Sequence, residues 1–337
     1  MKHSAKYLKS NLNKLYAAAT LLFIAGAAFG LLCGSTDIDF AGIISAIKNG
    51  AVGAEENIFL YVRLPRTLGC LTVGAALSVA GGVIQNVLAN RLASPSIIGV
   101  NSGAGLAVTL CTATGLYGGW QLSAFSFFGA FLAVMIISTG AQKWGASRGT
   151  VILMGVAMNS IFNAFSDTII TLNPNVGVMS NDFKIGDFSS VTYIKLIPAM
   201  IIVALSICIL LTLKNELDIL SMGEESARAL GLNTKLMRTV FLIIAALLSG
   251  CSVCIAGLLS FVGLIVPHAI RRFGVFSAGH LLSLCALFGG GFVAICDTIS
   301  RTVFAPYEIP VGIIMAFLGA PFFIFILIKG KGGHSDA

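Results

Sequence analysis

The stretch SFVGLIVPHAIRR, Ser260–Arg272, begins inside a longer run, Thr239–Ile270, that holds no Lys, Arg, Asp or Glu, and it ends with the two arginines that follow this run. As one helix rising ~1.5 Å per residue, this run would be roughly 48 Å long, whereas the hydrocarbon core of a bilayer is ~30 Å thick. We therefore expect a break, with Pro267 as its cause, because proline lacks an amide donor and clashes with the preceding turn. A broken helix that ends in Arg271 and Arg272 is typical of a path through a membrane rather than of a simple anchor.

Composition sets the class of the whole chain. Of its 337 residues, 57% are hydrophobic and only 10% are charged, whereas about a quarter of the residues in a soluble domain are charged. The apolar runs are continuous rather than alternating, which excludes an outer-membrane barrel. We therefore predict an all-α polytopic membrane protein, forming one transmembrane domain over residues 1–337.

The apolar runs predict about ten transmembrane helices, some of them short or broken. The expected spans are Leu15–Cys33, Thr67–Asn90, two within Leu92–Gln142, Thr150–Leu172, Leu196–Leu213, Thr239–Leu259, a short one around Pro267, Leu281–Thr302 and Pro310–Ile328.

Loop charges predict the orientation. Four lysines precede the first span, and the loop that follows it is rich in acids: Lys2, Lys6, Lys9 and Lys14, then Asp37, Asp39, Glu55 and Glu56. By the positive-inside rule, both termini are expected in the cytoplasm and the chain in the cell (inner, cytoplasmic) membrane.

Polar residues inside the spans are few. Asn159, Asn163 and Asp167 follow one another at i, i+4 spacing on a single helix face. Lining of a pathway and structural hydrogen bonding are equally good explanations of such a row. Asp297 and Arg301 are also four residues apart, and pairing with each other is the favoured interpretation.

The sequence contains no motif that is typical of a nucleotide, metal or catalytic site. No glycine-rich phosphate loop is present, so we expect no nucleotide and no other cofactor on this chain. Cys251-x-x-Cys254 has no second pair or histidine cluster, and small apolar packing explains it better than a metal site. His268 has no Ser, Cys or Glu at catalytic spacing, so we expect no catalytic residues and no enzyme.

The loop Lys214–Arg238 differs from its surroundings because it mixes acids and bases in an amphipathic pattern. Asp218 or Ser221 is expected to begin a short helix there, and Gly231 to cap its end. A solvated connection needs no such helix, so we interpret it as a docking surface for a cytoplasmic partner. The residues concerned are Ser221, Glu224, Glu225, Arg228, Leu230 and Gly231.

Several motifs, in order from about residue 60 to the C-terminus, together resemble the FecCD-type permease family of ABC importers. They are Arg63-Leu-Pro-Arg66, Gly74-Ala-Ala-Leu, Gly82-Val-Ile-Gln85, Pro95-Ser-Ile-Ile-Gly99-Val, Ala227-Arg-Ala-Leu-Gly231, Gly257-Leu-Leu-Ser-Phe261-Val-Gly-Leu-Ile-Val-Pro267-His268, Asp297 with Arg301, and Glu308-Ile-Pro310-Val-Gly312.

The resemblance implies a type II importer permease with ten helices per subunit. Two permease subunits, identical or paralogous, would flank a central pathway, with two ATPase subunits beneath that use the ATP. An extracytoplasmic substrate-binding protein would deliver an iron–siderophore, haem or cobalamin. The helix near Ser221–Gly231 would be the coupling helix, received in a groove of the ATPase.

The resemblance also implies that Arg63, Arg66 and Arg301 meet glutamates of the binding protein. Guanidinium groups suit such carboxylate pairing. Headgroup anchoring, or internal pairing with Asp297 and Glu308, is the alternative.

A proton- or sodium-driven secondary transporter is the alternative function. It would account for the broken helix and for the carboxylates in the spans, Asp167 and Asp297. It leaves the amphipathic loop helix without a role.

Overall fold

The computed structural model describes residues 2–34, 45, 46, 48, 50, 53–116, 119–143 and 148–331, and every regular element among them is a helix. The elements are α1 (Lys2–Leu32), α3 (Ala54–Ile58), the π-helical turn η1 (Phe59–Arg63), α4 (Leu64–Val87), α5 (Val100–Ala113), α6 (Gly119–Lys143), α7 (Arg148–Leu172), α8 (Pro174–Ile185), α9 (Tyr193–Thr212), α10 (Lys214–Ser221), α11 (Glu224–Ala229), α12 (Thr234–Ala256), α13 (Val262–Arg272), α14 (Ala278–Thr302) and α15 (Val311–Lys331).

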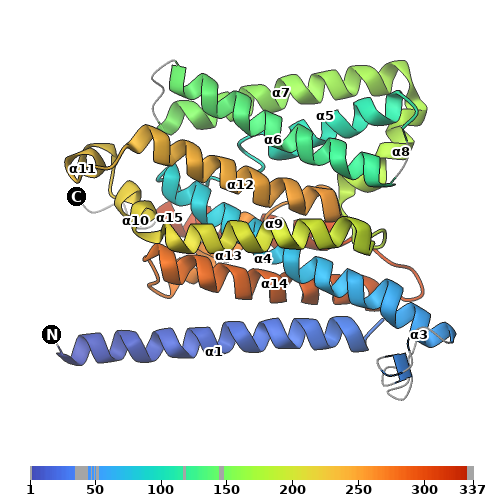
Figure 1. Cartoon of the computed structure of the whole chain (residues 1–337), viewed down its shortest axis with the longest axis horizontal. Coiled ribbons are helices and arrows are strands. Elements are labelled where there is room, and N and C mark those ends of the chain that lie inside the picture. Colours follow the sequence, from blue (N-terminus) through green and yellow to red (C-terminus); the bar gives the residue numbers. More distant parts are fainter. Residues whose placement is uncertain are drawn as a thin grey trace.

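The long helices run side by side, with α11 at one end of the bundle and α3 at the other (Figure 1). In the described part of the chain, seven helices are long and apolar enough to cross a membrane, and α5 and α15 supply two shorter apolar helices. With α13, each of the ten expected spans coincides with a helix. The prediction of an all-helical multi-span membrane protein is confirmed, and α8 is an addition that the sequence analysis missed.

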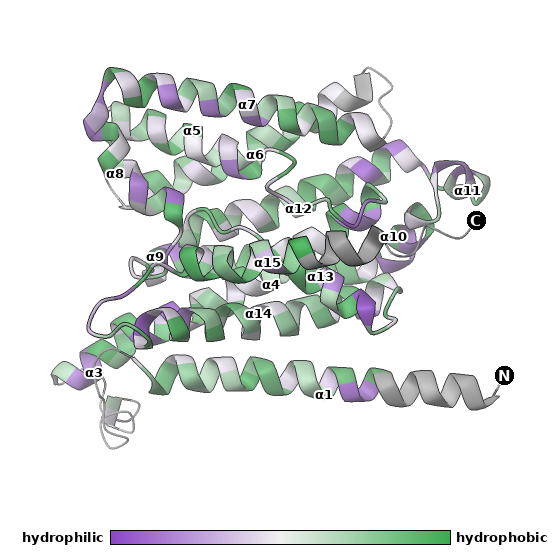
Figure 2. Cartoon of the chain, turned by 180° about the vertical axis from the view of Figure 1, so that it is seen from behind, coloured by the Kyte–Doolittle hydropathy of each residue, from purple (hydrophilic) through white to green (hydrophobic). Residues whose placement is uncertain are grey.

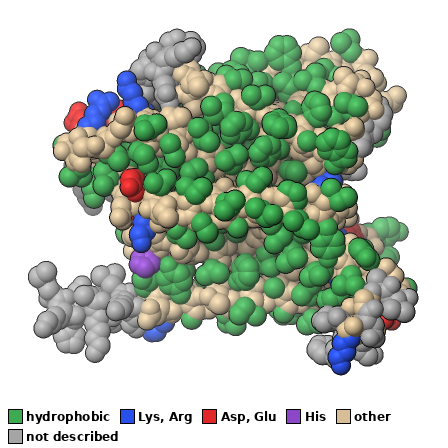
Figure 3. All heavy atoms as spheres, in the orientation of Figure 1, with side chains coloured by type: hydrophobic (Ala, Val, Ile, Leu, Met, Phe, Trp, Pro, Cys, Tyr) green, Lys and Arg blue, Asp and Glu red, His purple; other side chains and the backbone are tan. Residues whose placement is uncertain are grey.

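Hydropathy varies along the length of the helices, from the α11 end of the bundle to the α3 end. Green apolar segments fill the middle of the helices in Figure 2, whereas purple segments gather toward the ends. In the space-filling view, hydrophobic side chains cover the middle of the visible face and most charged side chains lie near its two ends (Figure 3). This distribution is the one that a surface surrounded by lipid requires.

Helix α4 is the centre of the packing. It contacts α14, α12, α13, α1 and α9, and 89% of its most apolar stretch is buried inside the protein. A helix that is apolar on every side needs such surroundings, since it has no face left for water.

Small residues bring the neighbours of α4 unusually close. A Cβ on Gly81 would lie 1.9 Å from the carbonyl oxygen of Gly263 in α13, and one on Gly74 would lie 2.2 Å from that of Gly289 in α14. In lipid, where association gains little from the hydrophobic effect, such backbone approach supplies dispersion contacts. The two glycines therefore set the distance between α4 and its partners.

The break in the long apolar run lies between α12 and α13, at residues 257–261. Gly257 has φ 69° and Phe261 has φ 67°, conformations that end one helix and turn the chain into the next. The expectation that Pro267 causes the break was wrong, because Pro267 lies inside α13. Proline leaves the carbonyl four residues earlier without its amide donor, and Gln85 Nε2 donates to that oxygen, on Gly263, at 3.2 Å.

Adjacent glycines in α4 offer a matched test of this packing. Gly81→Ala is expected to lower the free energy of unfolding by about 1–3 kcal/mol, because the new methyl group would overlap backbone atoms. Gly82→Ala is the control, since its Cβ would have its nearest neighbour, a Leu282 methyl group, at 3.6 Å. Thermal melting in detergent measures both, and equal melting temperatures would contradict the role of Gly81.

Candidate functional site

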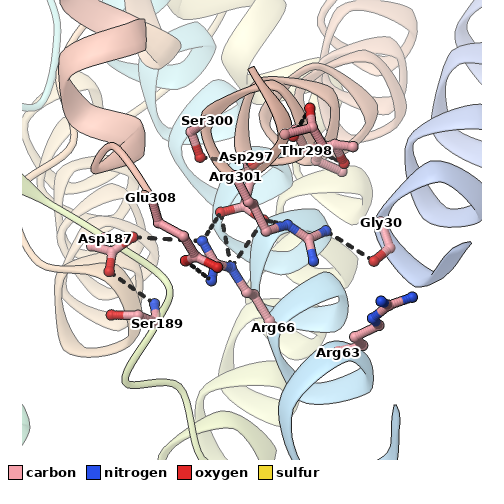
Figure 4. Close-up of polar contacts among 12 residues, drawn as sticks. Gly30, Arg63, Arg66, Asp187, Ser189, Asp297, Thr298, Ser300, Arg301 and Glu308 are labelled. Carbon is pink, nitrogen blue, oxygen red and sulfur yellow. Dashed lines mark hydrogen bonds and ion pairs between the residues drawn. The ribbon is translucent and has the colours of Figure 1, made fainter. Parts of the chain in front are cut away.

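A cluster of buried ion pairs lies at the α3 end of the bundle (Figure 4). Arg66, in the first turn of α4, directs its guanidinium at Asp297 of α14, with Nη2 and Oδ1 3.0 Å apart and Nε 3.1 Å from both carboxylate oxygens. Arg66 is 4% exposed and Asp297 1% exposed. Since neither charge reaches water, each neutralises the other.

Two loops bring further carboxylates to the same guanidinium. Glu308, between α14 and α15, accepts a hydrogen bond from Arg66 Nη1 at 2.7 Å. Asp187, between α8 and α9, lies 3.8 Å from Nη2 and accepts a hydrogen bond from the Ser189 amide at 3.1 Å. Arg66 therefore ties both loops to the core helices α4 and α14.

Helix α1 is attached to this cluster through its last turn. The final carbonyls of a helix have no partners within it. Arg301 Nη2 donates to the carbonyl of Gly30 at 2.9 Å, and Arg63 Nη1 donates to those of Leu31 and Leu32 at 3.1 and 2.9 Å. Two arginines thus satisfy the end of α1.

The three arginines expected to dock a binding protein are therefore buried, with 3% of Arg63 and Arg301 exposed. Internal pairing, the alternative named for them, is the arrangement found for Arg66 and Arg301. The Asp297–Arg301 pair is confirmed, with Nε and Oδ2 3.1 Å apart. Docking through these side chains stays a prediction, but in this conformation each has an internal partner. The sequence analysis missed Asp187, which no spacing relates to α4.

Polar side chains of α5, α7 and α8 line a second feature, a cavity of about 350 Å³. Asn159, Asn163 and Asp167 all face it, together with Lys184 of α8. Asn159 also donates from Nδ2 to the carbonyls of Ser96 and Ile97, both at 3.2 Å. The row thus lines a cavity, and its first member also makes structural hydrogen bonds.

The charged segment between α9 and α12 forms two helices rather than the single one expected. Helix α10 is anchored: Leu217 and Leu220 are fully buried, and Asp218 Oδ1 accepts from the first amide of α14, on Ala278, at 2.7 Å. The expected start was wrong, because Asp218 lies inside α10 and Ser221 is its last residue. Gly223, with φ 120°, turns the chain there, and α11 begins at Glu224.

Helix α11 is held by its charges. Glu224 accepts hydrogen bonds from Arg238 at 2.8 Å and from Arg228 at 2.5 Å. The Arg238 hydrogen bond, followed by the charges of both arginines, lowers the pKa of the Glu224 carboxyl below 4.5. The stability that these two ion pairs contribute is therefore present above the ordinary glutamate pKa. It is lost as the pH falls through the lowered pKa of Glu224. Gly231 has φ 81°, which confirms the expected cap.

No group of three or more His, Cys, Asp or Glu side chains within the described ranges could hold a metal ion. The described residues instead form a bundle of apolar spans with one broken helix. Its charges are neutralised at one end, and a short charged helix lies at the other. These features define a polytopic membrane transport protein.

Comparison with known proteins shows the family. The FecCD transport family matches residues 21–329, so the chain belongs to this family. It is a permease of an ABC importer and is not itself the ATPase, so the alternative of a secondary transporter is set aside.

Two relatives and one structure illustrate the similarity. The chain is 33% identical to the Fe(3+)-citrate import system permease protein YfmD of Bacillus subtilis (strain 168), over 98% of this chain and 99% of that protein. It is 34% identical to the vitamin B12 import system permease protein BtuC of Yersinia pseudotuberculosis, over 80% and 82%. A solved structure described as an inward-facing conformation of a metal-chelate type ABC transporter matches with TM-score 0.82 and 27% identity, over 94% and 99%.

The buried cluster generates a stability prediction. Asp297→Asn removes the carboxylate that Arg66 and Arg301 share, and breaking a buried pair in this way costs about 3–5 kcal/mol. Glu308→Gln is the control, because Glu308 is 35% exposed and water compensates for its loss, so a change below about 1 kcal/mol is expected. Thermal melting of the two variants decides between a structural and a dispensable cluster, and equal melting would exclude the structural role.

Proposed function

We propose that this chain is a single permease domain that pairs with a second permease subunit, identical or paralogous, to form the pathway of an ATP-driven importer for a metal chelate. The family match carries this proposal, together with the similarity to permeases named for Fe(3+)-citrate and vitamin B12 import. An iron–siderophore is the cargo we favour, with haem and cobalamin as alternatives.

The partners follow from the same assignment. Two cytoplasmic ATPase subunits would supply the energy, and an extracytoplasmic binding protein would deliver the chelate. Helix α1 begins and α15 ends at the α11 end of the bundle (Figure 1). With the loop charges, this supports an orientation in which both termini and α11 are cytoplasmic and the α3 end faces outward.

Helices α10 and α11 would couple the ATPase to the pathway. Glu225, Arg228 and Leu230 are exposed on or beside α11, which suits a segment received in a groove of a partner. Only Leu213 separates α10 from α9, and Asp218 joins α10 to the start of α14. A push that α11 passes to α10 would therefore reach two spans, α9 and α14, as subunit rocking requires.

Delivery of cargo would take place at the α3 end. If Arg63, Arg66 and Arg301 pair with the binding protein, they must first leave Leu31, Glu308 and Asp297. We propose that they act chiefly by holding this end in the shape that the binding protein recognises.

ATP hydrolysis provides the first test of the proposal that the permease forms the pathway and a separate subunit hydrolyses ATP. The purified chain is expected neither to bind nor to hydrolyse ATP, because it has no phosphate loop. Activity should appear when the ATPase subunit is added, and uptake of a ferric chelate into proteoliposomes when the binding protein is also present. Uptake driven by a proton or sodium gradient without ATP would contradict the proposal, whereas uptake of haem or cobalamin alone would correct the cargo.

The coupling role generates a second prediction. Arg228→Glu places like charges beside Glu224 and on the docking face, and Leu230→Ser removes an exposed apolar contact while leaving the ion pairs intact. Each is expected to weaken ATPase binding about tenfold, the equivalent of ~1.4 kcal/mol.

Arg228→Lys, which keeps the charge, is the matched control for this measurement. Dissociation constants from surface-immobilised permease in detergent, with melting temperatures to verify folding, give the readout. Wild-type affinity in both Arg228→Glu and Leu230→Ser would show that α11 is not the docking element.

A further inference from the structure

A groove of about 290 Å³ lies between α6, α9 and α12, and it shares no lining residue with the polar cavity. Helix α12 forms its floor and α6 and α9 form its walls, an order that Figure 1 also shows. Two of its lining side chains are polar, Ser123 and Lys195, and the rest, including Cys251 and Cys254, are apolar.

The surroundings of the groove face lipid. Trp120 on α6 is 64% exposed, Phe128 on α6 is 61% exposed and Ile194 on α9 is 79% exposed. Large apolar side chains exposed at the middle and ends of membrane spans are covered by acyl chains rather than by water. The groove therefore continues the lipid-facing surface inward between two helices.

Lys195 is the one cation among the lining residues. It lies near the start of α9 and reaches across to the start of α6, where its Nζ is 3.4 Å from the position that a Cβ on Gly119 would take. Within the described residues, no carboxylate forms an ion pair with it. Trp120 lies beside it at the start of α6, and tryptophan prefers the level of the lipid headgroups.

We propose that this groove is a binding site for an anionic phospholipid. One acyl chain lies between Phe127 and Pro198 against the floor of α12, and the phosphate of the headgroup accepts hydrogen bonds from the Lys195 ammonium. Three features select this occupant: exposed apolar side chains surround the groove, its one cation lies beside Trp120 where α6 and α9 begin, and no carboxylate of the described residues forms an ion pair with that cation. The inference concerns a lipid rather than the cargo, so it goes beyond the proposed function.

The expected preference of the groove for an anionic over a zwitterionic lipid is small. A single lysine near the membrane surface contributes about 1 kcal/mol toward an anionic lipid, which corresponds to about fivefold preference over a zwitterionic lipid. The apolar wall contributes equally for both lipids, because their acyl chains are the same. Selectivity therefore reports on Lys195, and occupancy of the groove reports on its walls.

Tryptophan fluorescence makes the site measurable. The chain has two tryptophans, Trp120 and Trp144, so Trp144→Phe leaves only the one that lines the groove. The full chain with this change is reconstituted in vesicles that contain phosphatidylglycerol or phosphatidylcholine brominated on the acyl chains. We expect brominated phosphatidylglycerol to occupy the site about fivefold more strongly, seen as stronger quenching of Trp120.

Four variants separate the contribution of Lys195 from that of the groove walls. Lys195→Ala is expected to bring the preference to unity, and Lys195→Arg to retain it. Lys235→Ala, which removes a cation at the opposite end of α12, is the charge control and should leave the preference unchanged. Ala124→Leu fills the groove without changing charge, and it too should abolish the preference because the acyl chain is displaced.

Several results would overturn the proposal. Equal quenching by the two lipids in the unmodified groove would exclude headgroup selection, and a preference that survives Lys195→Ala would exclude Lys195 as its source. A preference that survives Ala124→Leu would place the lipid elsewhere. Loss of the preference on adding inorganic phosphate, but not chloride of the same ionic strength, would assign the site to a free anion instead.

Discussion

The constraint on which this structure depends is the absence of water around most of its backbone and its polar side chains. Every polar group within a membrane span must find its partner inside the protein. Gln85 donates to the carbonyl that Pro267 leaves free, and Arg63 and Arg301 satisfy the last carbonyls of α1. The ion pairs around Arg66 follow the same requirement, since a buried guanidinium without a carboxylate would be strongly destabilising.

Close packing around α4 follows from the same absence. Because lipid offers apolar contacts as good as those between helices, association depends on surfaces that approach closely. The backbones of α13 and α14 meet α4 at Gly81 and Gly74, so three elements form a rigid centre. The cluster at Arg66 and the anchoring of α10 at Asp218 lie at opposite ends of helices in or beside this centre. A displacement at one end of such a unit is transmitted rather than absorbed.

The two ends of the bundle differ in how their charges are used. At the α3 end, Arg66 and Asp297 neutralise each other inside the protein. At the α11 end, Glu224 holds Arg228 and Arg238, while Glu225 and Leu230 remain exposed. Closed pairing suits an end that keeps its shape, and an exposed short helix suits the ATPase contact that we propose for the other end.

The sequence by itself determined the class, the approximate spans and the family, because apolar length and glycine, proline and arginine motifs are local properties of the chain. It also determined the Asp297–Arg301 pair and the cap at Gly231, since both depend on residues a few positions apart. Only the tertiary structure decided that the helix breaks at Gly257 and Phe261 rather than at Pro267, because a partner for the freed carbonyl comes from Gln85 on another helix. The burial of Arg66 among carboxylates of α14 and two loops could not be predicted from local sequence patterns either. It joins groups that are separated by more than a hundred residues along the chain.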